Sequence, residues 1–287
     1  MITISEIFKK YHTKLDPLDL ELLIAYVIKK PREFILAHSE YFLDQKQIEK
    51  IKKYAKRRLN HEPVAYILGQ KEFFGLNFKV NKHTLIPRPE TESLVEFALH
   101  KIQHEICSEK NIAIIDVGTG SGNIIISLIK NLEKSYNFFG IDISEKALAV
   151  AEYNAKKNNT TEKIKFIKSN LLNYFFDHCS LLTEPCIILA NLPYLSEKIY
   201  SKTLPNVKKF EPRSALFSGI YGLDHYEKLL EQIKILNTKN KILYTILEIS
   251  PEQKQKIEKI IKKYFPQAKI EFQKDLAKKW RFVSFSI

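Results

Sequence analysis

The stretch Ile114-Ile115-Asp116-Val117-Gly118-Thr119-Gly120-Ser121-Gly122 decides the fold. Its first half is an apolar, branched run that is typical of a buried strand, and its second half is a glycine-rich turn that leads into a helical pattern over residues 123–132. A strand, such a turn and a helix in this order let backbone N–H groups approach a nucleotide-like ligand. Taken alone the motif is weak, because an ordinary tight strand-to-helix turn also needs glycines.

The glycine spacing and one acidic residue indicate which ligand the turn binds. The three glycines follow the pattern G-x-G-x-G, whereas the dinucleotide fingerprint has its third glycine one residue later, where Asn123 stands. Asp142, at the end of the second predicted strand, supplies a carboxylate for two ribose hydroxyls. A tight turn beside a solvated aspartate is less favoured, because both features occur at the right separation. We predict S-adenosylmethionine rather than NAD as the cofactor.

Working outward, strands and helices alternate on both sides of this motif. Such alternation predicts an α/β domain with a parallel sheet and helices on both of its faces. The predicted strands cover residues 112–117, 138–143, 163–167, 186–190 and 241–249.

The first 60 residues have a different pattern, and we expect them to be wholly helical. Asp16-Pro17 reads as a cap and a first-turn proline, and the apolar run after it ends at Lys30-Pro31. Asp44 can cap a second helix, in which apolar residues recur at helical spacing. These are Ile48, Ile51, Ala55 and Leu59.

Between the two regions, residues 64–68 and 73–80 are rich in aromatic and branched residues and are separated by Gly69 and Gly75. This pattern predicts a β-hairpin. We therefore expect a helical domain over residues 1–62, a β-hairpin linker over 63–82 and a larger domain over 83–287.

Asn191-Leu192-Pro193-Tyr194 follows the strand predicted at 186–190, where an open α/β sheet binds its ligand. An amide nitrogen is a poor nucleophile because its lone pair is delocalised into the carbonyl, so a site that methylates one must hold it in line with the methyl group. The Asn191 side-chain oxygen and the Leu192 carbonyl can each accept one N–H of a planar NH₂ group. Pro193 fixes the turn, and Tyr194 offers a flat packing surface. An ordinary proline turn is the alternative, and the position after a buried strand makes it the weaker one.

These motifs together resemble the HemK/PrmC-type protein-(glutamine) methyltransferases, and the resemblance covers almost the whole chain. Further segments carry it. They are His61–Gly69, Phe73–Gly75, Leu85–Glu92, Glu211–Leu216 with Gly219 and Gly222–Asp224, Glu248 with Gln253, and Asp275-Leu276 with Arg281.

The resemblance implies methylation of the side-chain amide (N5) of the glutamine in the Gly-Gly-Gln motif of class I peptide chain release factors, which supports translation termination. It also implies that the amino-terminal helices help to dock the release factor. The hairpin would join them to a Rossmann-like class I S-adenosylmethionine methyltransferase domain, whose seven-stranded sheet has an antiparallel last strand.

The resemblance also implies roles for particular residues. Asp142 should bind the ribose, and Asn191 should touch both cofactor and substrate. Asn191, Pro193 and Tyr194 are the predicted catalytic residues, and all of 191–194 are predicted to bind substrate. The methionine part of the cofactor should lie on Gly118, Thr119, Gly120, Ser121 and Gly122.

Two positions depart from the family pattern. The family usually reads Asn-Pro-Pro-Tyr, and here Leu192 replaces the first proline, which loses some rigidity and gains an N–H. Because Pro193 restricts the residue before it, we expect the acceptor geometry to survive. The family usually has aspartate after the third strand, where this chain has Asn170 followed by Leu171. Asn170 can still accept a hydrogen bond from the adenine amino group and Leu171 can pack against the ring, with weaker cofactor binding.

Composition adds few constraints. The formal net charge of +13 suits an anionic partner, but lysines that only solvate helix faces explain it equally well. The three cysteines have no paired spacing, and His100 and His104 lack a second ligand pair, so we expect reduced thiols and no metal. With no signal peptide and no apolar run that approaches a membrane span, we expect a cytoplasmic protein that contacts no membrane. We also expect a monomer that does not bind nucleic acid directly.

Two alternative functions remain. An exocyclic adenine NH₂ presents the same pair of hydrogens, so an adenine N6-methyltransferase acting on RNA or DNA is the first. Asn-Leu-Pro-Tyr occurs in ribosomal RNA adenine dimethylases, but the helical region, the hairpin and residues 211–216 resemble the glutamine enzymes. A binding module without activity is the second, and the intact glycine turn, Asp142 and Asn191 argue against it.

Overall fold

The computed structural model describes residues 2–105, 112–134, 136–178, 182, 184–237 and 242–287. The chain divides into two compact units, one made of residues 1–70 with 204–210 and the other of residues 71–203 with 211–287. Cys107, Cys179 and the predicted strand start at Lys241 lie outside the described residues. Cys186 is a free, buried cysteine.

The first unit is helical around a small core of its own. Asp16 caps α2 and Asp44 caps α4, as predicted, through hydrogen bonds to Leu18 N and Gln47 N. Two short strands, β1 and β2, pair antiparallel. The prediction that this region is wholly helical is therefore wrong. The elements are β1 (Ile2–Thr3), α1 (Ile4–Tyr11), α2 (Pro17–Ile28), α3 (Arg32–Ala37), β2 (Phe42–Leu43), α4 (Gln45–Leu59), α5 (Val64–Leu68) and α11 (Pro205–Phe210).

The strand predicted over residues 64–68 is wrong, because these residues form α5. A five-residue apolar run fits a strand and a helical turn equally well. Here Pro63 precedes the helix and Gly69, at φ 72° in the left-handed region, ends it. The hairpin consists of β3 (Gln70–Phe73) and β4 (Leu76–Lys79). It therefore begins after residues 64–68, which were predicted to form its first strand.

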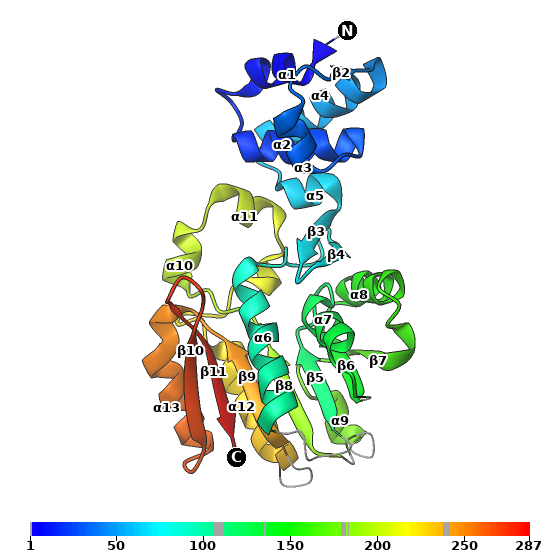
Figure 1. The fold of residues 1–287 in the computed structure, drawn as a ribbon. Coiled ribbons are helices and arrows are strands. Elements are labelled where there is room, and N and C mark those ends of the chain that lie inside the picture. Colours follow the sequence, from blue (N-terminus) through cyan, green and yellow to red (C-terminus); the bar gives the residue numbers. More distant parts are fainter. Residues whose placement is uncertain (1, 106–111, 135, 179–181, 183, 238–241) are drawn as a thin grey trace. The chain divides into compact units, whose positions relative to one another are not determined.

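The second unit contains a seven-stranded sheet of order β10-β11-β9-β8-β5-β6-β7 (Figure 1). All neighbours pair parallel except β11, which is antiparallel to both β9 and β10, as expected of the last strand. The strands are β5 (Ala113–Val117), β6 (Asn137–Asp142), β7 (Ile164–Lys168), β8 (Cys186–Ala190), β9 (Ile242–Glu248), β10 (Lys269–Lys274) and β11 (Trp280–Ser286).

Helices cover both faces of the sheet, which is why β5 and β8 are buried along their whole length (Figure 1). Helices α6, α7 and α8 pack on one apolar cluster and α9, α12 and α13 on the other. The remaining bounds are η1 (Pro89–Thr91), α6 (Glu92–His100), η2 (Lys101–Glu105), α7 (Asn123–Asn131), α8 (Glu145–Lys157), η3 (Thr161–Lys163), α9 (Tyr174–Asp177), α10 (Glu197–Lys202), η5 (Arg213–Ala215), α12 (Asp224–Asn237), η6 (Pro251–Gln253) and α13 (Lys254–Tyr264).

The register of the central strands positions the site. Val117, the last residue of β5, pairs with Ile141 of β6 and with Ala190, the last residue of β8. Because these strands are parallel, the segments that follow them emerge side by side at one edge of the sheet. Gly118, Asp142 and Asn191 therefore meet, although the sequence separates them widely.

Candidate active site

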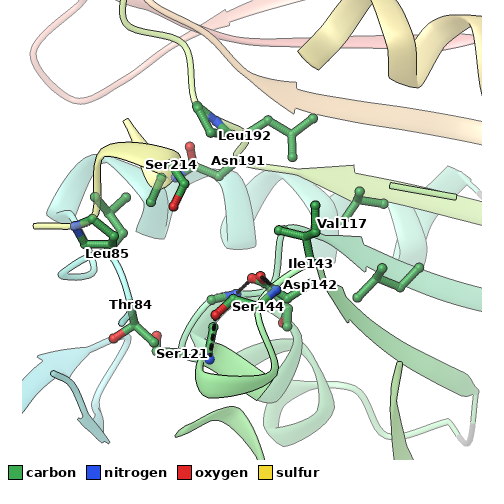
Figure 2. Close-up of a pocket in the computed structure, with 18 of the residues that line it drawn as sticks. Thr84, Leu85, Val117, Ser121, Asp142, Ile143, Ser144, Asn191, Leu192 and Ser214 are labelled. Carbon is green, nitrogen blue, oxygen red and sulfur yellow. Dashed lines mark hydrogen bonds between the residues drawn. The ribbon is translucent and has the colours of Figure 1, made fainter. Parts of the chain in front are cut away.

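A pocket lies at this edge, lined by the segments after β5, β6, β7 and β8 and by two further loops, residues 82–91 and 212–225. In Figure 2, Thr84, Leu85, the Asp142–Ser144 segment, and Asn191 with Leu192 surround one space. Every residue predicted for cofactor or substrate lines it except Gly122 and Tyr194. Segments of both loops, Leu85–Glu92 and Glu211–Leu216, carry the family resemblance, but no residue of either was assigned a role in the site.

The glycine turn is held against the neighbouring strand by its backbone. The N–H groups of Gly118 and Thr119 both donate to the carbonyl of Ile141, each at 2.8 Å. Gly118 has φ 78°, and a Cβ there would lie 2.9 Å from the Leu192 Cδ2 atom. The turn therefore requires glycine at this position for backbone geometry and for close contact with Leu192. Gly122 also has φ 78°, and a Cβ there would in addition meet Ile126 and Ala151.

Asp116 lies beneath the turn, fully buried, and accepts a hydrogen bond from the Thr119 hydroxyl at 2.7 Å. Burial raises the pKa of the Asp116 carboxyl to about 7, and the nearby Asp142 charge acts in the same direction. The hydrogen bond from Thr119 ties the turn to the end of β5, and Asp116 is not among the residues that line the pocket.

Asp142 is oriented by two backbone N–H groups. Gly120 N donates to Oδ2 at 3.0 Å, and Ser144 N donates to Oδ1 at 2.8 Å (Figure 2). Burial raises the pKa of the Asp142 carboxyl, and the Ser144 and Gly120 hydrogen bonds oppose that rise. The carboxylate is thus fixed in the pocket wall, next to the glycine turn, and its remaining lone pairs can accept hydrogen bonds from a ligand diol.

Asn154 of α8 joins the glycine turn to the hairpin and was missed by sequence reasoning. Its side-chain amide donates to the carbonyls of Ser121 at 2.9 Å and Lys79 at 3.0 Å, and its oxygen accepts from Lys79 N at 2.7 Å. The residue is fully buried. A buried asparagine on a helix was the available signal, but its partners are remote in sequence.

Apolar side chains form another part of the lining. Ile143 follows Asp142 directly and is 61% exposed, while Leu171 is buried at φ 53°, in the left-handed region. A leucine in this conformation is strained and persists only where its surroundings require it. Asn170 is exposed beside it. Asn170 and Leu171 were predicted for this site and Ile143 was not, although an apolar residue directly after Asp142 was a usable signal.

Asn191 is held by a residue from a distant segment. Its Nδ2 donates to the Thr91 hydroxyl oxygen at 3.1 Å, and the Thr91 hydroxyl donates to Glu248 Oε2 at 2.7 Å. No described residue donates to Asn191 Oδ1, so this oxygen is the acceptor that the side chain leaves for a ligand. Glu248 is buried, and burial raises the pKa of its carboxyl to about 7.

Leu192 is buried, and its backbone is hydrogen-bonded to Tyr226. Leu192 N donates to the Tyr226 hydroxyl at 3.2 Å, and that hydroxyl lies 3.4 Å from the Leu192 carbonyl and close to the Glu248 carbonyl. The N–H that leucine adds in place of proline therefore has a partner. The Leu192 carbonyl keeps a second lone pair for a further donor.

Pro193 lines the pocket, whereas Tyr194 does not. Tyr194 is held by contacts away from the pocket. Its ring packs on the apolar cluster of α12 and α13, its hydroxyl is 3.5 Å from Glu248 Oε1, and its carbonyl accepts from Gln253 Nε2 at 2.8 Å. Burial raises the pKa of the Tyr194 hydroxyl. Gln253 also donates to the Gly222 carbonyl at 2.9 Å, so its side chain links the segment of Tyr194 to the segment of Gly222.

An ion pair joins the two flanking loops at the pocket. Arg88 Nη2 lies 2.6 Å from Glu211 Oε1, and Ile86 N donates to Glu211 Oε2 at 3.2 Å. The Glu211 side chain is 1% exposed. Glu90 is exposed, and Glu92 begins α6 and accepts a hydrogen bond from Phe74 N at 3.0 Å.

Two protein-family models match the chain. The PrmC N-terminal domain matches residues 3–69, and a methyltransferase domain matches residues 108–263. The first match covers the helical region and the second covers most of the sheet.

Curated relatives match over nearly the full length. The release factor glutamine methyltransferase of Dictyoglomus turgidum is 37% identical, covering 90% of this chain and 86% of the relative. The release factor glutamine methyltransferase of Buchnera aphidicola is 36% identical, covering 89% of this chain and 87% of the relative. A bifunctional methyltransferase of Rickettsia bellii is 36% identical over 85% of this chain, which spans 46% of that longer protein.

Solved structures match in fold alone. The hMettl16 catalytic domain in complex with a 3′UTR hairpin has a TM-score of 0.58 at 16% identity, with 81% of each chain covered. A SAM-dependent methyltransferase from Agrobacterium tumefaciens has a TM-score of 0.51 at 12% identity, covering 76% of this chain and 69% of that one.

Proposed function

The chain belongs to the release factor glutamine methyltransferase family, and we propose that it transfers a methyl group from S-adenosylmethionine to the N5 amide nitrogen of the glutamine in the Gly-Gly-Gln motif of peptide chain release factors. The observation that carries the proposal is the Asn191 side chain. Its nitrogen is occupied by Thr91, so its oxygen is left as an acceptor in the pocket that holds Asp142 and the glycine turn.

The residues present fit S-adenosylmethionine. The Asp142 carboxylate is fixed where it can accept from two ribose hydroxyls, and three glycines of positive φ let the backbone approach a ligand closely. Ile143 and Leu171 offer apolar surface to a flat base, and Asn170 can accept from its amino group. S-adenosylmethionine supplies a methyl group on a positively charged sulfur.

This chain's own residues position the nucleophile. We assign the Asn191 side-chain oxygen and the Leu192 carbonyl as acceptors for the two N–H groups of the substrate amide, which fixes the plane of the amide and polarises its nitrogen. Pro193 restricts the backbone of Leu192, so that the carbonyl keeps its direction. The surplus proton of the methylated nitrogen leaves to water, and no general base is assigned.

A protein substrate is favoured over nucleic acid. Two relatives at 36–37% identity over most of the chain are named release factor glutamine methyltransferases, whereas the RNA-bound structure at 16% identity shares the fold alone. We propose that the helical unit contributes to docking of the release factor, and that the protein acts as a monomer in the cytoplasm, where translation terminates. The part of the chain that the structure describes contains no helix that could span a membrane.

The experiment that tests the function uses methyl-labelled S-adenosylmethionine and a purified class I release factor. The matched control is the same factor with its Gly-Gly-Gln glutamine changed to alanine. Label on the first and none on the second establishes the reaction and the modified residue. Label in RNA or DNA with none in the factor, in parallel incubations, contradicts the proposal and supports adenine methylation.

A further inference from the structure

Three side chains from distant segments form a hydrogen-bond chain that ends at the pocket. Asn191 follows β8, Thr91 lies in η1 before α6, and Glu248 ends β9. Asn191 Nδ2 is 3.1 Å from Thr91 Oγ1, and Thr91 Oγ1 is 2.7 Å from Glu248 Oε2. Thr91 and Glu248 are each 1% exposed, so water does not compete for these bonds.

The chemistry of the three groups gives the chain a direction. An ionised carboxylate only accepts hydrogen bonds, so the single proton of the Thr91 hydroxyl goes to Glu248. The Thr91 oxygen then has only lone pairs to offer, and Asn191 meets it with its NH₂ group. The two ends of an asparagine amide have almost the same shape, so hydrogen bonding decides which end faces where.

We propose that Glu248 and Thr91 are positioning residues for methyl transfer, which act through Asn191 by turning its amide oxygen toward the substrate. The inference rests on the proposed function for what the oxygen does. A reversed amide would present N–H groups to the N–H groups of the substrate glutamine, and two donors repel. Packing alone does not distinguish these orientations.

The direction of these hydrogen bonds depends on whether Glu248 is ionised, and the groups around Glu248 control its ionisation. The positive charge of Arg281 on β11 favours the ionised carboxylate, and the Tyr194 hydroxyl lies 3.5 Å from Oε1. Burial opposes ionisation most strongly and the Glu90 charge adds to it, while the Tyr226 hydroxyl donates to the Glu248 backbone carbonyl. A protonated Glu248 could donate to Thr91, which would then donate to Asn191 and reverse the amide. Methyl transfer should therefore decline as Glu248 is protonated.

Three variants separate direction from simple contact. Thr91→Val keeps the volume and removes the hydroxyl, whereas Thr91→Ser keeps the hydroxyl. Glu248→Gln keeps the shape but offers an NH₂ group, which can donate to Thr91. Thr245→Val is the matched control, since Thr245 is also buried on β9 and its hydroxyl has no hydrogen-bond partner among the described residues.

The kinetic test measures kcat and KM for the release factor, together with the Kd for S-adenosylmethionine. We expect Thr91→Val and Glu248→Gln to lower kcat by about 10²-fold, the size seen when one aligned polar group is lost from an active site. The cofactor Kd should change little, whereas the melting temperature should fall in Thr91→Val, because the buried Glu248 carboxylate loses a hydrogen-bond donor. Thr91→Ser and Thr245→Val should stay within about threefold of the unsubstituted enzyme. Unchanged kcat in Glu248→Gln would overturn the proposal.

A second readout does not depend on the substrate. In protein labelled with ¹⁵N-asparagine, the Asn191 side-chain NH₂ signals, assigned by their loss in Asn191→Asp, should shift between pH 8 and pH 6. That shift should disappear in Thr91→Val and Glu248→Gln and persist in Thr245→Val. If the pH-dependent shift of the Asn191 signals stays the same in both variants, the proposed hydrogen-bond chain is wrong. An enzyme that shows the shift but does not methylate the release factor contradicts only the proposed function.

Discussion

The backbone N–H of Leu192 donates a hydrogen bond to the hydroxyl of Tyr226, at 3.2 Å and out of contact with water. Leucine stands here where the related enzymes usually have proline, so this N–H would be an unsatisfied donor without Tyr226. The same hydroxyl contacts the Glu248 carbonyl at the end of the neighbouring strand. The substituted turn is thus tied to the sheet by one side chain.

Tyr226→Phe should destabilise the protein by about 1–3 kcal/mol, because a buried donor loses its partner. Urea unfolding measures this, and the Leu192→Pro background is the control, since proline has no N–H to leave unpaired. We expect Tyr226→Phe to cost less in that background, with a coupling of about 1 kcal/mol in the double-mutant cycle. Additive effects would show that the two residues act independently.

Asn191→Ala should lower kcat for the release factor by about 10²–10³-fold, because one of the two acceptors for the substrate amide is lost. Single-turnover methyl transfer measures this directly. The cofactor Kd, by calorimetry, should change by less than about tenfold. Methylation that survives this substitution contradicts the proposed mechanism.

Asp142→Asn should raise the Kd for S-adenosylmethionine at least about tenfold, or 1.4 kcal/mol. The two carboxylate oxygens accept from Gly120 N and Ser144 N, and an asparagine must present its NH₂ group to one of these donors. Calorimetry with the cofactor alone measures the change. Asp177→Asn, an exposed position at the end of α9, is the control and should bind normally.

Gly118→Ala should cost about 1–2 kcal/mol of stability and also lower kcat. Its φ of 78° strains any other residue, and its Cβ would lie 2.9 Å from Leu192 Cδ2, so the Leu192 side chain must shift next to its acceptor carbonyl. Gly75→Ala separates the two effects, because Gly75 has φ 70° and a Cβ there would meet no atom within 4 Å. Equal kcat losses in both variants would argue against the contact with Leu192.

The stability of the protein should depend on pH through Asp116. Burial raises the pKa of this carboxyl in the folded state from 3.8 to about 7, so its proton stabilises the fold at low pH. This contribution is complete below about pH 4 and is lost as the pH rises toward 7. Relative to Asp116→Asn, the unsubstituted protein should lose up to about 1.4 kcal/mol per pH unit between pH 5 and 7, with little change above pH 8. Urea unfolding at each pH measures the difference, and a constant difference refutes it.

The sequence could predict the elements that carry a periodic signal. The described starts and ends of β5, β6, β7 and β8 lie within one residue of the predicted strands, because buried branched runs between turn residues have few other solutions. Asp44 likewise begins α4, since its side chain satisfies a free N–H at the helix start. The strand predicted over residues 64–68 was wrong because five apolar residues do not distinguish the helical period from the strand period.

Part of the candidate site followed from the same reasoning. Parallel strands bring their carboxyl ends to one edge, so a glycine turn after β5, an acid at the end of β6 and an asparagine after β8 had to converge. Neither Thr91 nor Glu248 carries a local sign of the contact between them, and 157 residues separate the two. The same holds for Asn154 and Lys79, which are 75 residues apart.

Turn chemistry and strand burial are local properties, so the amino-acid sequence was enough to predict the fold class, the methyltransferase family and most of the residues that line the candidate pocket. Only the tertiary structure decided which way those residues are turned. The orientation of the Asn191 amide depends on Thr91 and Glu248, and the backbone of Leu192 depends on Tyr226. A hydrogen bond has a direction that its partner sets, and these partners come together only when the sheet and its covering helices have assembled.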